Sequence, residues 1–207
     1  MKNWLPLLRE IRAGVYSAVL LAAVLGVVGC SSKGEVVVPA PNAFLAPHPE
    51  SAEGTDRGVE IVVETNAWDG DPPDLGAGAI ALKVTIQNES SHPLAIRYSN
   101  FALVAANDQR YSDIPPYSIT GRSYEHLQPR WAYSDANYFA VPLPTKQMLE
   151  KAVAEGTVSE RGTVKGFLYF KKPAPRSPAI SFRAVLVDSQ TGETFGRIVV
   201  PLQVKPI

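Results

Sequence analysis

The chain of 207 residues has a single cysteine, Cys30, so it has no second thiol for an intramolecular disulfide. Basic and acidic residues balance at 20 each, and Lys and Arg form no run. This balance excludes the strongly basic surface that is typical of nucleic-acid-binding proteins. Without disulfides, a folded domain must rest on a hydrophobic core, and the chain after residue 58 is long enough to bury one.

The first 29 residues have the layout of a secretory signal peptide. Lys2, Arg9 and Arg12 precede residues 13–28, which carry no charge. As a helix that uncharged run would span about 24 Å, which is shorter than the hydrocarbon core of a bilayer. A basic segment followed by a short apolar segment and small residues predicts an exported chain.

The residues Val27-Val28-Gly29-Cys30 resemble the lipobox of bacterial lipoproteins. The resemblance implies that the Cys30 thiol receives a diacylglyceryl group, that the leader is removed before Cys30 and that the new amino group is acylated. Lipidation would also cap a thiol that lacks a partner in an oxidising compartment. Ser31 resembles the pattern that is sorted to the outer membrane, facing the periplasm. The alternatives are a plain signal peptide with an incidental cysteine and an uncleaved anchor.

Residues 30–58 are predicted to form a tether that begins at the lipidated cysteine. Four prolines, at positions 39, 41, 47 and 49, disfavour a helix and remove backbone donors. A flexible tether of this length would reach roughly 30 Å and hold a folded domain away from the membrane. The run Val36–Val38 could instead pair as an edge strand.

From Val59 onward, apolar and polar residues alternate, which is typical of strands with one buried face. Strands are predicted over residues 59–65, 80–87, 94–99, 101–105, 110–113, 163–170, 180–188 and 194–204. A single short crossover helix is predicted over 146–155, capped by Thr145 and ended by Gly156. About seven or eight strands with little helix predict an all-β protein, an antiparallel β-sandwich.

The segment from Val84 to Ser112 resembles the first half of small immunoglobulin-like domains in bacterial lipoproteins. Asn88, Ser90, Pro93 and the later GFLYFKKP segment, residues 166–173, carry the resemblance. It implies an immunoglobulin-like β-sandwich over residues 59–207. The aromatic insertion loop at 111–145 departs from the compact version of that domain. The cysteine pair and packed tryptophan of antibody domains are absent.

The segment 111–139 holds five of the eight tyrosines and one of the three tryptophans of the chain. Tyr, Trp and Arg are the residue types that anchor binding surfaces, and aromatic faces stack on sugar rings. We therefore expect this loop to contact an envelope protein or cell-wall glycan. The alternative is a satellite core that covers the end of the sandwich. The predicted contact residues are Tyr117, Arg122, Tyr124, His126, Arg130, Trp131 and Tyr133.

Catalysis is the less favoured interpretation. His126, with Asp113 and Asp135, could serve an envelope hydrolase or a metal-dependent enzyme, but the spacing of zinc ligands is missing. Asp69, Asp71 and Asp74 fit a solvated turn better than a calcium loop. No nucleophile motif or phosphate loop is present. We expect no enzyme activity, no cofactor and no metal, and a purely structural lipoprotein remains a third alternative.

Overall fold

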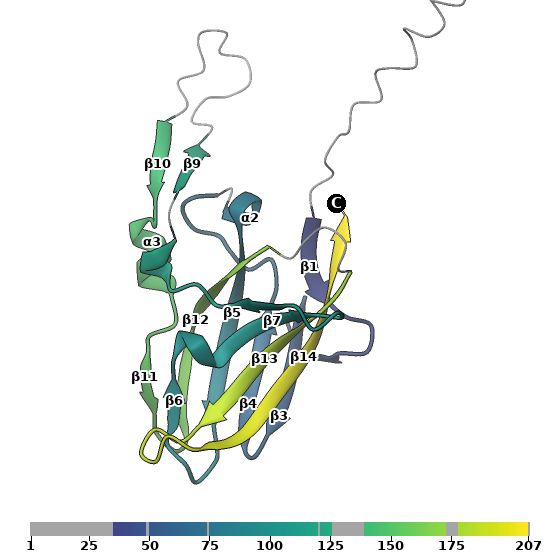
Figure 1. Cartoon of the computed structure of the whole chain (residues 1–207), viewed down its shortest axis with the longest axis vertical. Coiled ribbons are helices and arrows are strands. Elements are labelled where there is room, and N and C mark those ends of the chain that lie inside the picture. The colour runs from purple at the N-terminus through teal and green to yellow at the C-terminus, as the bar shows by residue number, and fades with distance from the viewer. Residues whose placement is uncertain are drawn as a thin grey trace, which may run out of the picture. The chain divides into compact units, whose positions relative to one another are not determined.

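The computed structural model describes residues 35–48, 50–73, 75–119, 121–125, 139–172 and 178–206. Two antiparallel five-stranded sheets face each other and form a sandwich (Figure 1). The first sheet runs, in spatial order, β1 (Glu35–Pro39), β14 (Thr194–Pro206), β13 (Ala179–Val187), β7 (Phe101–Ala105) and β8 (Arg110–Ser112). The second runs β12 (Gly162–Lys171), β5 (Ala79–Asn88), β4 (Val59–Glu64), β3 (Ser51–Asp56) and β2 (Phe44–Leu45).

Alternation along the strands builds the core between the sheets. In β4, Ile61 and Val63 are fully buried, while the residues beside them are partly exposed. Phe182 and Ala184 do the same in β13. Because side chains on a strand point to opposite faces in turn, each sheet has one apolar face, and the two apolar faces pack together. The predicted all-β, antiparallel sandwich is confirmed, and each predicted strand range contains a strand.

The predicted boundary at residue 59 is wrong, because residues assigned to the tether belong to the sheets. Strand β1 pairs with β14, with Val37 opposite Val204, and β3 pairs with β4 along its whole length. Val37 and Ala52 are both buried. Pro39 is tolerated because β1 is an edge strand, where a missing donor faces no partner. The burial of apolar residues in β1 and β3 therefore decided the structure of this segment, despite its four prolines.

A second, smaller apolar cluster covers the outer face of the second sheet. Two short helices contribute to it, α2 (Leu75–Gly78) and α3 (Lys146–Lys151), together with Ile119, which follows the 3₁₀ turn η2 (Pro116–Ser118). Met148 of α3 is fully buried in this cluster. Thr145 caps α3 as predicted, accepting the Met148 N–H at 3.2 Å.

Helix α3 ends at Lys151, before the predicted stop at Gly156. The chain turns extended at Ala152, and the Val153 N–H donates to the Phe167 carbonyl at 3.0 Å. Pairing with β12 thus replaces the last helical turn. The following strand β11 (Gly156–Val158) pairs with β6 (Leu94–Ile96), after which η1 (Tyr98–Asn100) leads into β7.

The predicted insertion contains a two-stranded antiparallel ribbon made of β9 (Gly121–Glu125) and β10 (Phe139–Leu143). Tyr124 lies opposite Ala140, and Arg122 lies opposite Pro142. Figure 1 shows this ribbon next to α3, apart from the two large sheets. Among the described residues, no helix is long and apolar enough to cross a bilayer.

Candidate functional site

A pocket of about 440 Å³ opens where the two large sheets part at one end of the sandwich. Both sheets contribute apolar side chains to its wall, and α2 and the segment before it complete the lining. The apolar lining includes Val36, Val37, Trp68, Ile80, Leu82 and Val204. Its volume lies within the roughly 300–1,000 Å³ of small-molecule sites, and its mainly apolar lining is typical of them.

Trp68 is held rigidly beside the pocket. Its indole N–H donates to the Pro72 carbonyl at 2.8 Å. Its ring meets Phe167 edge-on at 5.1 Å between centroids, and the Lys151 ammonium lies 5.5 Å from the ring centre. Lys151 also pairs with Asp69 at 2.6 Å, and this pairing lowers the pKa of Asp69. The Trp68 ring also forms part of the pocket wall.

Three polar side chains, Glu35, Asn66 and Lys172, join the apolar lining of the pocket. Asn66 is exposed and donates to the Glu50 carboxylate at 3.0 Å, so it lies at the rim. Glu35 and Lys172 are partly buried, and neither has an ion pair within the described part of the chain. A ligand with an apolar body and a small polar end matches this arrangement.

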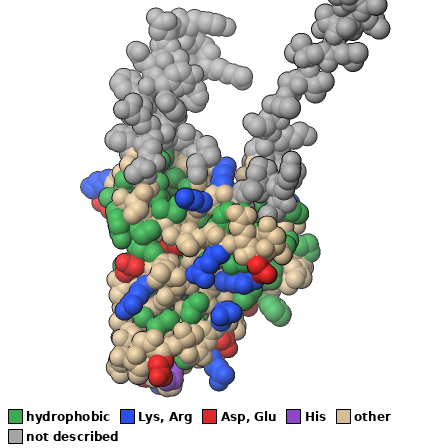
Figure 2. Space-filling view, viewed as in Figure 1, with side chains coloured by type: hydrophobic (Ala, Val, Ile, Leu, Met, Phe, Trp, Pro, Cys, Tyr) green, Lys and Arg blue, Asp and Glu red, His purple; other side chains and the backbone are tan. Residues whose placement is uncertain are grey.

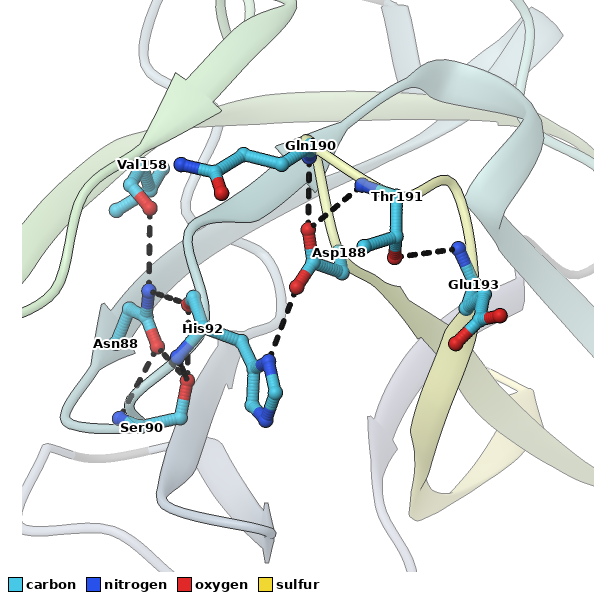
Figure 3. Close-up of polar contacts among 8 residues, drawn as sticks. All are labelled: Asn88, Ser90, His92, Val158, Asp188, Gln190, Thr191 and Glu193. Carbon is cyan, nitrogen blue, oxygen red and sulfur yellow. Dashed lines mark hydrogen bonds and ion pairs between the residues drawn. The ribbon is translucent and has the colours of Figure 1, made fainter.

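The opposite end of the sandwich is closed by a polar cluster (Figure 3). The buried Asn88 side chain donates to the carbonyls of His92 at 2.8 Å and Val158 at 3.1 Å, and accepts from the Ser90 hydroxyl at 2.6 Å. His92 Nδ1 lies 3.0 Å from the Asp188 carboxylate. These bonds join three loops, so Asn88 and Ser90 hold the fold at this end.

Asp188 remains ionised within this cluster. The backbone N–H groups of Thr191 and Gln190 donate to its carboxylate at 3.1 and 2.7 Å. These bonds, followed by the contact with His92, lower the pKa of Asp188. The His92 ring also stacks on Phe195 at 5.0 Å between centroids. The arrangement fixes the turn after β13.

A second surface feature lies on the outer face of the first sheet. Arg110, Arg183 and Arg197, from β8, β13 and β14, line a shallow groove of about 230 Å³. The one acid in its lining is Asp108, whose carboxylate lies 3.9 Å from the Arg183 guanidinium. Figure 2 shows basic side chains gathered near the middle of the viewed face. This groove has an excess of positive charge.

Asp113, a residue of the alternative catalytic set, is buried. One carboxylate oxygen accepts the Tyr169 N–H at 2.9 Å, and the other has no hydrogen-bond partner among the described residues. Burial raises the pKa of Asp113 to about 8, so the group is mainly protonated at neutral pH. Its proposed partners, His126 and Asp135, lie outside the described residues. In the part of the chain that is described, no three His, Cys, Asp or Glu side chains gather as a metal site.

The predicted contact residues are only partly within the described structure. Tyr117 lies in η2 with 66% of its surface exposed. Arg122 and Tyr124 lie in β9, where the backbone alone is described. Four others, His126, Arg130, Trp131 and Tyr133, lie outside the described residues, as does Cys30.

Sequence reasoning missed the pocket. It assigned Val36–Val38 to a tether, with an edge strand as the alternative that the structure confirms, and it connected neither possibility with a pocket. The signal that was available is the Val36–Val38 run, which is as rich in β-branched residues as the later strands.

Comparison with known proteins gives no family. No protein-family model matches the chain. No curated protein matches it in sequence. Among solved structures, a protein of unknown function from Listeria monocytogenes aligns over 84% of this chain and 90% of its own, with 13% identity and a TM-score of 0.41. The secreted protein MPT63 from Mycobacterium tuberculosis aligns over 75% and 96%, with 11% identity and a TM-score of 0.31.

A candidate lipoprotein from Bacillus subtilis, ycdA, aligns over 73% of this chain with 12% identity and a TM-score of 0.40. The alignment spans only 38% of that longer chain. Likenesses at this level do not identify a function.

Proposed function

We propose that this protein is a lipid-anchored binding module of a bacterial cell envelope. The observation that carries the proposal is the order of parts at the N-terminus. A basic segment, an uncharged run and Val27-Val28-Gly29-Cys30 come in succession, and the first strand of the sandwich begins at Glu35. Two or three acyl chains on Cys30 would hold the domain stably on a bilayer. Ser31 favours the outer membrane, facing the periplasm.

We assign the sandwich to the immunoglobulin-like kind. Two features that support the resemblance also have a structural role. Asn88 and Ser90 are bonded to each other in the turn after β5. Gly166, which opens the GFLYFKKP segment, lies where β12 passes close to the backbone of Ala152 and Val153. Face-to-face packing of two antiparallel sheets agrees with this class.

The proposed role is binding, with the aromatic insertion as the contact surface and an envelope protein or cell-wall glycan as the partner. Tyr117 supports this proposal because an exposed tyrosine ring supplies a large contact area with few rotatable bonds. The β9–β10 ribbon supports it because Arg122 and Tyr124 share its first strand.

Intact-mass spectrometry of protein purified from membranes tests the anchor. We expect a chain that begins at Cys30 and carries the added mass of a diacylglyceryl group and an amide-linked acyl chain. The Cys30→Ala variant should retain its leader and lack these additions, while Ser31→Ala should still be processed. A processed wild-type chain with a free thiol would overturn the anchor.

Crosslinking in intact cells tests the contact surface. Combining Tyr117→Ala with Trp131→Ala should reduce capture of the native partner at least fivefold while the melting temperature stays unchanged. Phe44→Ala is the matched control, because Phe44 is 78% exposed and lies on β2, far from the insertion in sequence. Loss of stability in the double variant would show that these rings form part of a core. Unchanged capture would exclude the insertion as the contact surface.

A further inference from the structure

The anchor and the folded domain lie much closer together in sequence than a tether of 30–58 would place them. Four residues, 31–34, separate Cys30 from Glu35, the first residue of β1. Even a fully extended chain covers no more than about 18 Å between these two α-carbons. If Cys30 is lipidated as proposed above, Glu35 lies near the membrane surface.

The pocket lies at this same end of the sandwich. Glu35 and Val36, which open β1, are part of its lining, as are Ala79 and Ile80, which open β5. Figure 1 shows the start of β1 and α2 at one end of the sheets, with β6 at the other. The proposed anchor therefore limits how far the pocket can move from the bilayer.

The chemistry of the pocket matches a hydrocarbon chain. Val36, Ile80 and Leu82 offer an apolar wall from two sheets, and the side of Trp68 completes it. Water in such a space makes few hydrogen bonds, because the lining has only a few polar side chains, those of Asn66, Glu35 and Lys172. A hydrocarbon chain that moves here from a bilayer exchanges one apolar environment for another, so its transfer meets little hydrophobic penalty.

We infer that this pocket receives an acyl chain of a membrane lipid that is not covalently bound to the protein. The inference rests on the proposed lipid anchor, which keeps the pocket close to a dense supply of lipid. The protein's own acyl chains are the less suitable occupants, because their withdrawal from the bilayer would weaken the anchor. The polar end of the bound lipid would remain at the rim, near Asn66 and Lys172.

The test uses the full mature protein, purified with its anchor and placed in phospholipid nanodiscs. One arm contains phospholipid with a photoreactive diazirine in an acyl chain. Illumination should attach this lipid to peptides from β1 and from the start of β5, as mapped by mass spectrometry. In a second arm only the protein's own acyl chains carry the diazirine, introduced by feeding the cells a labelled fatty acid. We expect the second arm to give no adduct on those peptides.

Gly76→Phe is the blocking variant. Gly76 lines the pocket, and a Cβ atom added there meets no atom within 4 Å, so a side chain can start there without a clash at Cβ. We expect at least a fivefold loss of adducts in the first arm. Leu149→Phe is the control, because Leu149 is an exposed residue of α3 outside the pocket lining. Val36→Phe, on the edge strand, is a second blocking variant if Gly76→Phe lowers the melting temperature.

The outcomes separate this inference from the proposed function. A lipidated protein without adducts on β1 and β5, or with adducts that Gly76→Phe and Val36→Phe leave unchanged, overturns the inference alone. Adducts in the second arm instead of the first assign the pocket to the protein's own chains and also overturn it. An intact mass without lipid at Cys30 overturns both proposals.

Discussion

Asn88 and Val158 lie 70 positions apart in the chain and are joined by a hydrogen bond of 3.1 Å from the side-chain amide to the main-chain carbonyl. Asn88 is fully buried and is the last residue of β5, where it pairs with both neighbouring strands. This amide therefore ties the loop after β11 to the turn after β5 (Figure 3). It closes one end of the sandwich, while the pocket leaves the other end open.

The Asn88→Ala variant tests the importance of this tie. Removing the amide leaves the buried carbonyl of Val158 and the hydroxyl of Ser90 without a bond that they now make. We expect a loss of about 2–4 kcal/mol in the free energy of unfolding, measured by urea denaturation. Gln87→Ala is the control, because Gln87 is exposed on the same strand, and it should change stability by no more than about 0.5 kcal/mol. Equal effects of the two variants would contradict a structural role for the Asn88 amide.

Asp113 should make stability depend on pH. Its pKa is about 8 in the folded protein, raised by burial from 3.8. Between these values the folded state holds a proton that the unfolded chain releases, so the free energy of unfolding falls as pH rises through this window. Each pH unit contributes up to about 1.4 kcal/mol.

The Asp113→Asn variant isolates this effect. Its amide oxygen can still accept the Tyr169 N–H, but the side chain no longer titrates. Urea denaturation from about pH 5 to about pH 7.5 should show a falling stability for the wild type relative to the variant. Taking the difference between the two proteins cancels the contribution of every other ionisable group, because both proteins share those groups. Parallel pH profiles would show that Asp113 is ionised in the folded state.

Gly166 should not tolerate a side chain. A Cβ atom at this position of β12 would lie 2.7 Å from the Val153 nitrogen and 2.9 Å from the Lys151 oxygen, both of which are backbone atoms. The segment after α3 would have to move, and its bond to Phe167 would be strained. We expect Gly166→Ala to lose about 1–3 kcal/mol, as overpacked sites do. Gly76→Ala, which has open space, should lose less than about 1 kcal/mol in the same thermal or urea measurement.

The arginine groove should respond to a carboxylate. Val199 is 47% exposed and lies directly opposite Arg183 on the outer face of the first sheet. Val199→Glu would place opposite charges across the two strands, whereas Val199→Gln has the same shape without the charge. We expect the Glu variant to be more stable than the Gln variant by about 0.3–1 kcal/mol at low salt. The difference should vanish in about 1 M NaCl, because salt screens exposed charges. A difference that salt leaves unchanged would contradict a charge effect.

The strands after Val59 could be predicted because the alternation of buried and exposed positions is visible in neighbouring residues. Phe182 and Ala184 alternate with partly exposed neighbours, and that alternation is visible without the fold. The start of α3 was predictable for the same reason, since Thr145 needs only Met148 to cap it. Its end was not predictable, because it depends on a bond from Val153 to Phe167, on a strand that follows later in the chain.

The tether failed as a prediction for a related reason. Four prolines are a strong local signal, but β1 obtains its partner from β14, at the far end of the sequence. The pocket depends on the same pairing, because β1 supplies Val36 and Val37 while β5 supplies Ile80 and Leu82. The sequence indicated that Asn88 lies near a turn. It could not indicate that the side chain is buried or that it is bonded to Val158.

The sequence by itself determined an all-β chain whose strands carry an apolar face, and it predicts an exported-type leader with a lipobox-like cysteine. These properties depend on the order and period of neighbouring residues. The tertiary structure alone decided that the fold includes residues 35–56, that one end of the sandwich is tied by Asn88 and that the other holds a pocket. The reason is physical: pairing and burial between distant segments are set by which apolar faces meet, and no local pattern records that choice.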